Sequence, residues 1–187
     1  MPAVDREGIA IRAATPADAP AIGRIHVESW RESHRGLLSE NLLDSVSALV
    51  RAAMWRGALE SERPILLFVA QRTSGDLVGF VGGGSSRTTS LPHDAEVYAI
   101  YVLRPAQRRG CGRRLMAALA DALLARGFTS LSLWVLEENA NARRFYERLG
   151  GAVVGEKTEL DNEHEFRVVA YGWNSLESLS STAIGRH

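Results

Sequence analysis

The sequence predicts an α/β fold built on a mixed sheet. Helical and strand-like periodicities alternate along most of the chain, and short runs of turn residues separate them. A length of 187 residues, with 45% hydrophobic and 24% charged side chains, is typical of one globular domain with one core. We therefore expect a single domain over 1–187, with its core at about 9–173 and a loose tail at 174–187.

The N-terminal half is expected to form a strand, two helices and a hairpin. Thr15 and Pro16 supply an N-cap and a first-turn proline for the first helix. A turn around Gly75 separates two apolar runs, which indicates a hairpin of antiparallel strands. The expected elements are a strand at 8–13, helices at about 16–34 and from Ser39 to Leu59, and strands at 65–70 and 77–82.

The C-terminal half alternates strands and helices more regularly. It follows a soft polar stretch that begins at Gly82 and ends near His93. Pro105 ends the next strand, and Gly127 and Gly151 each end a helix. The expected elements are strands at 95–103, 131–136, 152–157 and 164–173, and helices at 112–127 and 139–151.

Charge and cysteine content exclude several classes of protein. Lys plus Arg and Asp plus Glu each total 22, so the net charge is zero and we expect no nucleic-acid partner. Cys111 is the single cysteine, so the chain has no internal disulfide and we expect a cytoplasmic protein. No apolar run is long enough for a signal peptide or a membrane span. His26 and His34 lack a third ligand, so we expect no metal and interpret His26 as a packing histidine.

The segment from Arg104 to Arg114 carries the strongest functional signal. It lies between a strand and a helix, and five of its eleven residues are arginines. Gly110 and Gly112 let backbone N–H groups turn inward, and the helix that follows directs the positive end of its dipole to the same point. Converging N–H donors with flanking guanidinium groups suit a diphosphate, so we expect a nucleotide-like ligand.

Spacing separates three phosphate-binding motifs. A P-loop is excluded because Glu156 stands between the Gly and the Lys of the nearest candidate. A dinucleotide-binding GxGxxG is excluded because Leu115 occupies the third glycine position. The remaining pattern, Gln/Arg-x-x-Gly-x-Gly/Ala, is matched by Gln107 to Gly112 at every specified position.

With these residues in place, the sequence resembles the GNAT superfamily of acetyl-CoA-dependent N-acetyltransferases. In that family the pattern at Gln107 to Gly112 binds the diphosphate of coenzyme A, and a later Asn-x-x-Ala-x-x-x-Tyr segment lines the thiol end. Asn139, Ala142 and Tyr146 match the second segment. Gly151 departs from the pattern, because relatives usually carry a bulky apolar residue there. The resemblance implies a GNAT-like acyltransferase fold, with a central, mostly antiparallel sheet flanked by helices on both faces.

The resemblance also implies which residues bind acetyl-CoA as a cosubstrate, with no metal. Pantetheine would add to the strand near Ile100 like an extra strand, and a backbone N–H there would reach the thioester carbonyl. The implied cofactor-binding residues are Ile100, Tyr101, Val102, Gln107, Arg108, Arg109, Gly110, Cys111, Gly112, Arg113, Asn139, Ala142 and Tyr146.

Three further residues receive roles, each with a structural alternative. Glu96 is interpreted as the general base for the incoming ammonium, or else as a solvated strand residue. Tyr146 is interpreted as the general acid for the leaving thiolate, or else as a core aromatic. Trp30 is interpreted as a wall of the acceptor pocket, or else as core. Cys111 occupies a variable motif position, so we do not interpret it as a nucleophile.

The resulting hypothesis is an N-acetyltransferase that transfers acetyl from acetyl-CoA to a primary amine of a small molecule or peptide by direct attack. The alternatives are a non-catalytic acyl-CoA-binding sensor or interaction module, and a nucleotide-binding regulator. The orientations of Glu96 and Tyr146 discriminate the enzyme from the binding module. A homodimer is compatible with the class, although no residue of the sequence indicates one.

Overall fold

The computed structural model describes residues 8–36, 40–62, 65–161 and 164–181. Its strands are β1 (Ile9–Ala13), β2 (Leu66–Arg72), β3 (Leu77–Ser85), β4 (Ala95–Val102), β5 (Leu131–Leu136), β6 (Ala152–Asp161) and β7 (His164–Trp173). Its α-helices are α1 (Ala19–His34), α2 (Glu40–Ser45), α3 (Ala48–Glu60), α4 (Cys111–Leu124) and α5 (Ala140–Arg148). Short 3-10 helices cover Pro16–Asp18, Arg104–Ala106 and Leu176–Leu179.

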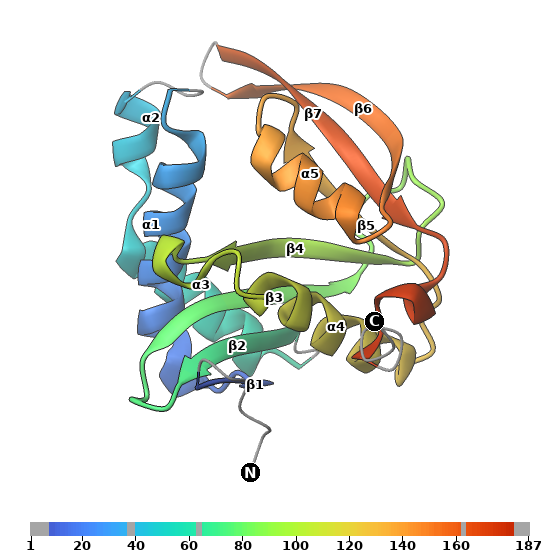
Figure 1. Ribbon diagram of the computed structural model, residues 1–187. Helices are drawn as coiled ribbons and strands as arrows, with labels where there is room; N and C mark the ends of the chain where they lie inside the picture. The colour runs from blue at the N-terminus through green and yellow to red at the C-terminus, as the bar shows by residue number, and fades with distance from the viewer. Residues whose placement is uncertain (1–7, 37–39, 63–64, 162–163, 182–187) are drawn as a thin grey trace. The chain divides into compact units, whose positions relative to one another are not determined.

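The strands form one mixed sheet in the order β1-β2-β3-β4-β5-β7-β6 (Figure 1). Five pairings are described in register, and four of these five are antiparallel, among them β1 with β2, β2 with β3, and β6 with β7. β5 and β7 are also antiparallel, whereas β4 and β5 are parallel where Ala95 pairs with Leu131 and Glu96 with Ser132. This confirms the predicted α/β fold with a mixed, mostly antiparallel sheet.

The chain divides into two compact units. Unit 1 comprises Met1–Gly83 and Ala99–Leu119, and unit 2 comprises Gly84–Tyr98 and Ala120–His187. The strands β3 and β4 and the helix α4 each pass from one unit into the other along the chain. The candidate residues therefore fall into two groups, and each group is described within its own unit.

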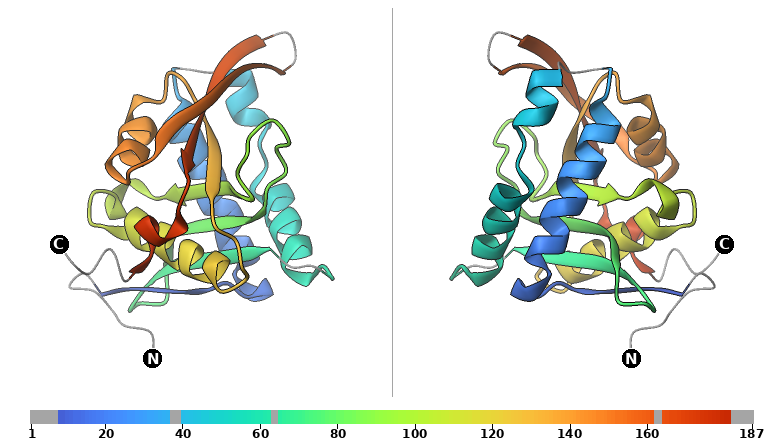
Figure 2. Two further views of the ribbon diagram at one scale, coloured as in Figure 1. Left: turned by 90° about the vertical axis from the view of Figure 1, so that its right-hand side faces the viewer. Right: turned by 90° about the vertical axis from the view of Figure 1, so that its left-hand side faces the viewer.

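Unit 1 has helices on both faces of its strands, with α1 and α3 on one face and α4 on the other (Figure 2). Two glycines of β3 lie on opposite faces of the strand, and their nearest neighbours identify the helix on each face. A Cβ on Gly82 would lie 3.0 Å from the Trp55 ring of α3, whereas a Cβ on Gly79 would lie 3.4 Å from Leu115 of α4. The apolar core between the strands and the α1–α3 pair consists of Ile22, Ile25, Trp55, Leu67, Val69, Leu77 and Phe80.

In unit 2, the helix α5 packs on one face of the strands, and the segment between β3 and β4 packs on the other face. On the α5 side, the Trp173 indole donates to the Leu149 carbonyl oxygen at 2.9 Å. On the other side, a Cβ on Gly172 would lie 2.5 Å from Nε2 of His93, so the histidine ring lies directly on the β7 backbone. We call residues 86–94 the covering segment.

Asp94 anchors the end of the covering segment. Its carboxylate accepts hydrogen bonds from the backbone N–H groups and the hydroxyls of Thr129 and Ser130, at 2.8–3.0 Å. Partial burial raises the pKa of Asp94, but these four bonds outweigh it and hold the pKa at about 2. The segment is therefore tied to the turn before β5 while this carboxylate stays ionised.

Three element predictions are wrong or incomplete. The helix expected from Ser39 to Leu59 is two helices, because Ser47 has extended backbone angles of −93° and 131° and caps α3. Ser39 itself and the side chain of Leu42 lie outside the described residues. The tail expected to be loose after Asn174 contains a 3-10 helix whose Leu176 and Leu179 are buried. The first helix opens with a separate 3-10 turn at Pro16–Asp18, capped at Thr15 as expected.

Candidate functional site

The turn between β4 and α4 in unit 1 has the backbone that an anion-binding loop requires. We call residues 104–110 the arginine loop. Arg108 has a φ of 58° and Gly110 a φ of 79°, both in the left-handed region. Alternation of left- and right-handed residues turns successive N–H groups toward one side of the chain. A Cβ added at Gly110 would have no atom within 4 Å, so the space beside the loop is open.

Two contacts hold the arginine loop. The Gln107 side chain donates to the Val102 carbonyl oxygen at 2.8 Å and so fastens the loop to the end of β4. Ala106 is fully buried and anchors the loop to the core, whereas the loop residues on either side of it are exposed. The motif glutamine therefore has a structural task within the loop.

The helix α4 begins directly after the arginine loop. Its first residue, Cys111, is buried at 1% exposure. The first N–H groups of a helix lack intrahelical partners and carry the positive end of its dipole. The arginine-loop backbone and the start of α4 thus present donors and positive charge together.

The five arginines of this segment have different environments. Arg104, Arg108 and Arg109 are exposed, and Arg113 is half-buried. Arg114 donates to the Ile9 carbonyl oxygen of β1 at 3.0 Å, so its guanidinium supports the fold of unit 1. The sequence pattern alone did not distinguish this structural arginine from the others.

The end of β4 in unit 1 contributes both backbone and core. Ile100, Tyr101 and Val102 are half-buried, and the next residue donates from its backbone to the Val78 carbonyl oxygen at 2.8 Å. The Tyr101 ring packs against His26 at 5.0 Å between centroids. Burial raises the pKa of Tyr101 to about 12, so its phenol stays protonated at neutral pH. The expected role of this backbone toward a thioester stays a prediction.

His26 is the packing histidine that we expected. It is 7% exposed, and its Nδ1 accepts a hydrogen bond from the Trp55 indole at 3.1 Å. Its ring also packs against Phe80 and Tyr101. Burial is the larger cause and the positive charge of Arg51 the smaller one, and together they lower the pKa of His26 to about 4. A neutral imidazole therefore lies in the core of unit 1.

The second motif forms the start of α5 in unit 2. Asn139 is the N-cap, and its side-chain oxygen accepts from the Ala142 backbone N–H at 3.1 Å. The spacing of Asn139 and Ala142 is thus also that of an N-cap and its third residue. Gly151, which departs from the family pattern, leaves space for an indole, because a Cβ there would lie 2.6 Å from Trp173.

Tyr146 lies inside an aromatic cluster of unit 2. Its side chain is buried at 7% exposure, with the Phe145, Tyr171 and Trp173 rings at 5.4, 5.7 and 6.3 Å. The ring is therefore a core aromatic, as the structural alternative held. Because a buried tyrosine can still direct its hydroxyl toward a ligand, its role as general acid stays a prediction.

Glu96 is buried at 7% exposure on β4, so the solvated alternative is wrong. Its Oε2 accepts from the Arg87 backbone N–H at 2.9 Å and from the Thr88 hydroxyl at 3.1 Å. Its Oε1 lies 3.5 Å from Nη2 of Arg87. The carboxylate therefore faces the covering segment, and its role as general base stays a prediction.

Sequence reasoning missed the covering segment as part of the site. Thr88 also accepts from the Trp134 indole of β5 at 3.2 Å, so the segment reaches a second strand. His93 and Ser132 are buried, and no hydrogen-bond partner for their side chains is found among the described residues. No local sequence signal marked the segment, because the contact between Arg87 and Glu96 forms only when the chain folds.

Trp30 lies at the end of α1 in unit 1. It is half-buried, and its ring is 5.1 Å from that of His34. Burial lowers the pKa of His34. Its Nδ1 lies 2.7 Å from the Trp30 carbonyl oxygen, and this hydrogen bond has the smaller, opposite effect of raising the pKa. Whether Trp30 contacts an acceptor stays a prediction, and residues 37–39 after it lie outside the described part of the chain.

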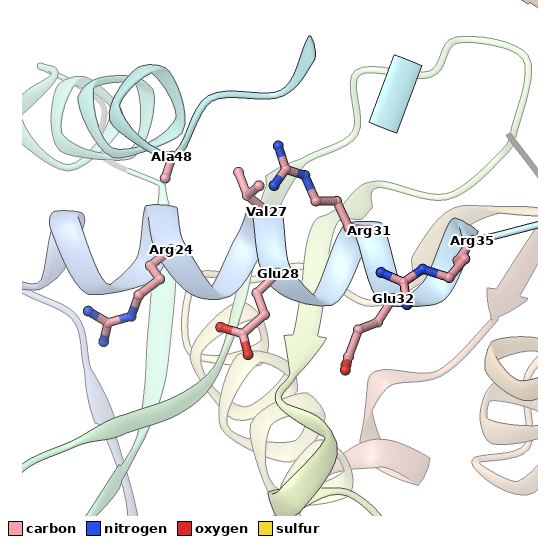
Figure 3. A pocket seen from close by; sticks show the side chains of 7 residues that line it. All are labelled: Arg24, Val27, Glu28, Arg31, Glu32, Arg35 and Ala48. Atoms are coloured by element: carbon pink, nitrogen blue, oxygen red, sulfur yellow. The ribbon is translucent and has the colours of Figure 1, made fainter. Parts of the chain in front are cut away.

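A groove of about 410 Å³ runs along the exposed face of α1 (Figure 3). Figure 3 shows Arg31 and Glu28 pointing in opposite directions from the helix. Arg31 donates to the Leu43 carbonyl oxygen at 2.9 Å, so it is already engaged by α2. The mixed charges of the groove do not favour an anionic ligand. The residues that line it are Arg24, Val27, Glu28, Arg31, Glu32, Arg35 and Ala48.

Two general features of the described residues bear on the class of protein. Within 8–36, 40–62, 65–161 and 164–181, no three His, Cys, Asp or Glu side chains are grouped as metal ligands would be. In the same part of the chain, every helix is too short or too polar to span a bilayer.

Known proteins are similar to this chain in sequence. Residues 24–151 match the model of the acetyltransferase (GNAT) family. Over 174 residues the chain is 32% identical to the uncharacterized N-acetyltransferase YuaI of Bacillus subtilis strain 168, which covers 92% of this chain and 97% of that protein.

Two solved structures have a similar fold. The PaiA N-acetyltransferase from Thermoplasma acidophilum, solved in complex with coenzyme A, has a TM-score of 0.67 at 20% identity and covers 88% of this chain and 99% of its own. The Salmonella typhimurium protein yncA, solved with its cofactor acetyl-CoA, has a TM-score of 0.68 at 21% identity and covers 89% and 93%.

A mixed sheet with an arginine-rich, left-handed turn between a strand and a helix defines an α/β protein with an anion-binding loop. The family match and the identity to YuaI show more than this. The chain belongs to the GNAT family of acetyltransferases.

Proposed function

We propose that this protein transfers acetyl from acetyl-CoA to a primary amine of a small molecule or peptide by direct attack. The observation that carries the proposal is the arginine loop, whose left-handed Arg108 and Gly110 lead into the N-terminus of α4. This backbone fits a diphosphate, and the chain belongs to a family with relatives solved with coenzyme A or acetyl-CoA.

The proposal assigns the diphosphate to the arginine loop and the first turn of α4. The exposed Arg108 and Arg109 supply positive charge, and the open space at Gly110 admits a ligand close to the backbone. When bound, acetyl-CoA supplies an activated acetyl group and a thiolate leaving group. Arg114 is left out of this assignment because β1 already engages it.

The catalytic assignments follow the proton balance of the reaction. The acceptor must lose a proton before its nitrogen forms the new C–N bond, and Glu96 takes that proton. The breaking C–S bond leaves a thiolate, and Tyr146 donates a proton to it. Backbone N–H groups near Ile100 to Val102 donate to the acetyl carbonyl oxygen. No covalent enzyme intermediate is needed.

One observation favours the non-catalytic acyl-CoA-binding module as a second candidate. The Tyr146 ring is buried among other aromatics, and both Glu96 oxygens have partners within the covering segment. Catalysis requires at least one of these side chains to reach the reacting atoms. A pure binding module does not require this.

The proposal also covers domain organisation and location. The family model spans 24–151 and so includes parts of both compact units, which supports one GNAT-type domain. A cytoplasmic location belongs to the proposal because it rests on the single cysteine alone.

A screen of primary amines with detection of released thiol tests the function, with calorimetry of coenzyme A binding measured alongside. Tyr146→Phe should retain coenzyme A binding and lose most of the thiol release. Tyr171→Phe is the matched control, because it removes a hydroxyl from the same cluster that donates to Glu147 at 2.7 Å and has no assigned catalytic role. Binding without turnover of any amine would favour the binding module, and absence of coenzyme A binding would refute both candidates.

A further inference from the structure

An arginine of the covering segment lies on the face of a tyrosine ring in unit 2. The guanidinium carbon of Arg87 is 3.6 Å from the centroid of the Tyr98 ring. At this distance a cation is attracted by the negative face of the ring. The same guanidinium is 3.5 Å from Oε1 of Glu96. One cation therefore contacts a ring face and a carboxylate oxygen together.

The ring is held in place independently of Arg87. The Tyr98 hydroxyl donates to the Ser85 carbonyl oxygen at 2.7 Å. A Cβ on Gly84 would lie 2.9 Å from the Tyr98 hydroxyl oxygen, so the glycine makes room for this position of the ring. The ring face would thus remain in place if the guanidinium moved away.

The two oxygens of Glu96 have different roles. Oε2 accepts two shorter hydrogen bonds, from the Arg87 backbone N–H at 2.9 Å and the Thr88 hydroxyl at 3.1 Å. These bonds orient the carboxylate and need no part of the arginine side chain. Oε1 contacts the guanidinium at 3.5 Å, which is long for a charge-assisted hydrogen bond. Oε1 is therefore the oxygen that can accept another cation.

The Arg87 side chain itself is held weakly. It is 61% exposed, and ion pairs of exposed side chains contribute little because water screens them. Its ring contact is likewise at the surface, where cation–π attraction is modest. Another cation of suitable size can displace the guanidinium without breaking the backbone bond to Glu96.

We infer that the Tyr98 ring face and Oε1 of Glu96 form a binding site for the ammonium group of the acceptor, which Arg87 occupies in the free protein. We call this pair the cation site. The inference rests on the proposed function and names its substrate class: primary alkylamines, which are cationic at neutral pH, rather than arylamines, which are neutral there. Arg87 is then a specificity-determining residue that competes with the acceptor.

Competition by Arg87 predicts a change in KM. When an internal group occupies a site, the apparent dissociation constant of a ligand equals the intrinsic constant divided by the fraction of molecules in which the site is free. An exposed ion pair together with a surface cation–π contact corresponds to roughly a 3- to 10-fold effect. Arg87→Ala should therefore lower KM for n-butylamine by about this factor, leave kcat within about twofold, and leave KM for aniline unchanged.

Variants of the two partners separate competition from a structural effect. Arg87→Lys retains a cation and should restore the parent KM. Tyr98→Leu removes the ring face and should raise KM for n-butylamine but not for aniline. Arg126→Ala removes an exposed arginine of the same unit and is the control, with no change expected for either amine. An unchanged or raised n-butylamine KM in Arg87→Ala, or an equal change for aniline, overturns the inference.

A binding measurement distinguishes this inference from the proposed function. NMR signals of the Arg87 side chain should be shifted upfield by the Tyr98 ring, and butylammonium chloride should return them toward ordinary values. This displacement without any acetyl transfer would support the cation site and refute the enzyme. Acetyl transfer to alkylamines without this displacement would support the enzyme and refute the cation site.

Discussion

The buried His26 predicts a loss of stability in mild acid. Its pKa is lowered from 6.5 to about 4, mainly by burial, and the Trp55 indole donates to its neutral Nδ1. An unfolded chain therefore binds a proton at this histidine between pH 6.5 and 4, whereas the folded chain does not. Stability from this residue is complete above pH 6.5 and falls as the pH is lowered toward 4.

The magnitude follows from the two pKa values. The full difference of 6.5 − 4 = 2.5 units corresponds to about 3 kcal/mol. Integration between pH 7 and pH 5, above the range in which most carboxylates titrate, leaves about 2 kcal/mol. This window isolates histidines, because Asp18 and Asp94 have pKa values of about 2 and lose their contribution at lower pH.

Urea unfolding at pH 7, 6 and 5, followed by tryptophan fluorescence and circular dichroism, measures the effect. His26→Gln should be less stable at pH 7 but should lose about 2 kcal/mol less than the parent protein on acidification to pH 5. His34→Gln is a matched comparison. His34 is half-buried at the end of α1, and burial lowers the pKa of this histidine also. An identical pH dependence in His26→Gln and the parent protein would refute the reasoning.

Three further predictions concern backbone positions. Gly23→Ala should destabilise the protein by more than about 2 kcal/mol in urea unfolding, because its Cβ would lie 2.4 Å from the Ala48 carbonyl oxygen where α1 meets α3. Gly110→Ala should lower the free energy of unfolding by about 1 kcal/mol, because the φ of this residue is 79°. The same substitution should weaken coenzyme A binding in calorimetry. An unchanged affinity would remove this glycine from the binding proposal. Asn139→Ala should cost about 1 kcal/mol by loss of the cap on the Ala142 N–H, and Asn139→Asp should restore most of it.

The sequence predicted well wherever the deciding interactions were local. Strand β7 has the predicted bounds, as does β5, and α4 begins one residue from its predicted start. The bounds of these elements depend on hydrophobic periodicity and on turn residues that lie within a few positions of each other in the sequence. The division of α2 from α3 was missed because the apolar pattern continues on both sides of Ser47, although serine is a favoured N-cap residue. The buried Leu176 was missed for a related reason, since its backbone bonds to Thr129, far away along the chain.

The same distinction applies to the site. By itself the sequence determined the family, the arginine loop and the cap of α5, because each depends on a contiguous motif whose residues act on neighbouring backbone. Only the tertiary structure decided that Arg114 supports β1, that Tyr146 is buried among aromatics, and that Arg87 faces Tyr98 and Glu96. Burial and charge pairing are properties of groups that folding brings together from separate segments, so no local pattern of residue types specifies them.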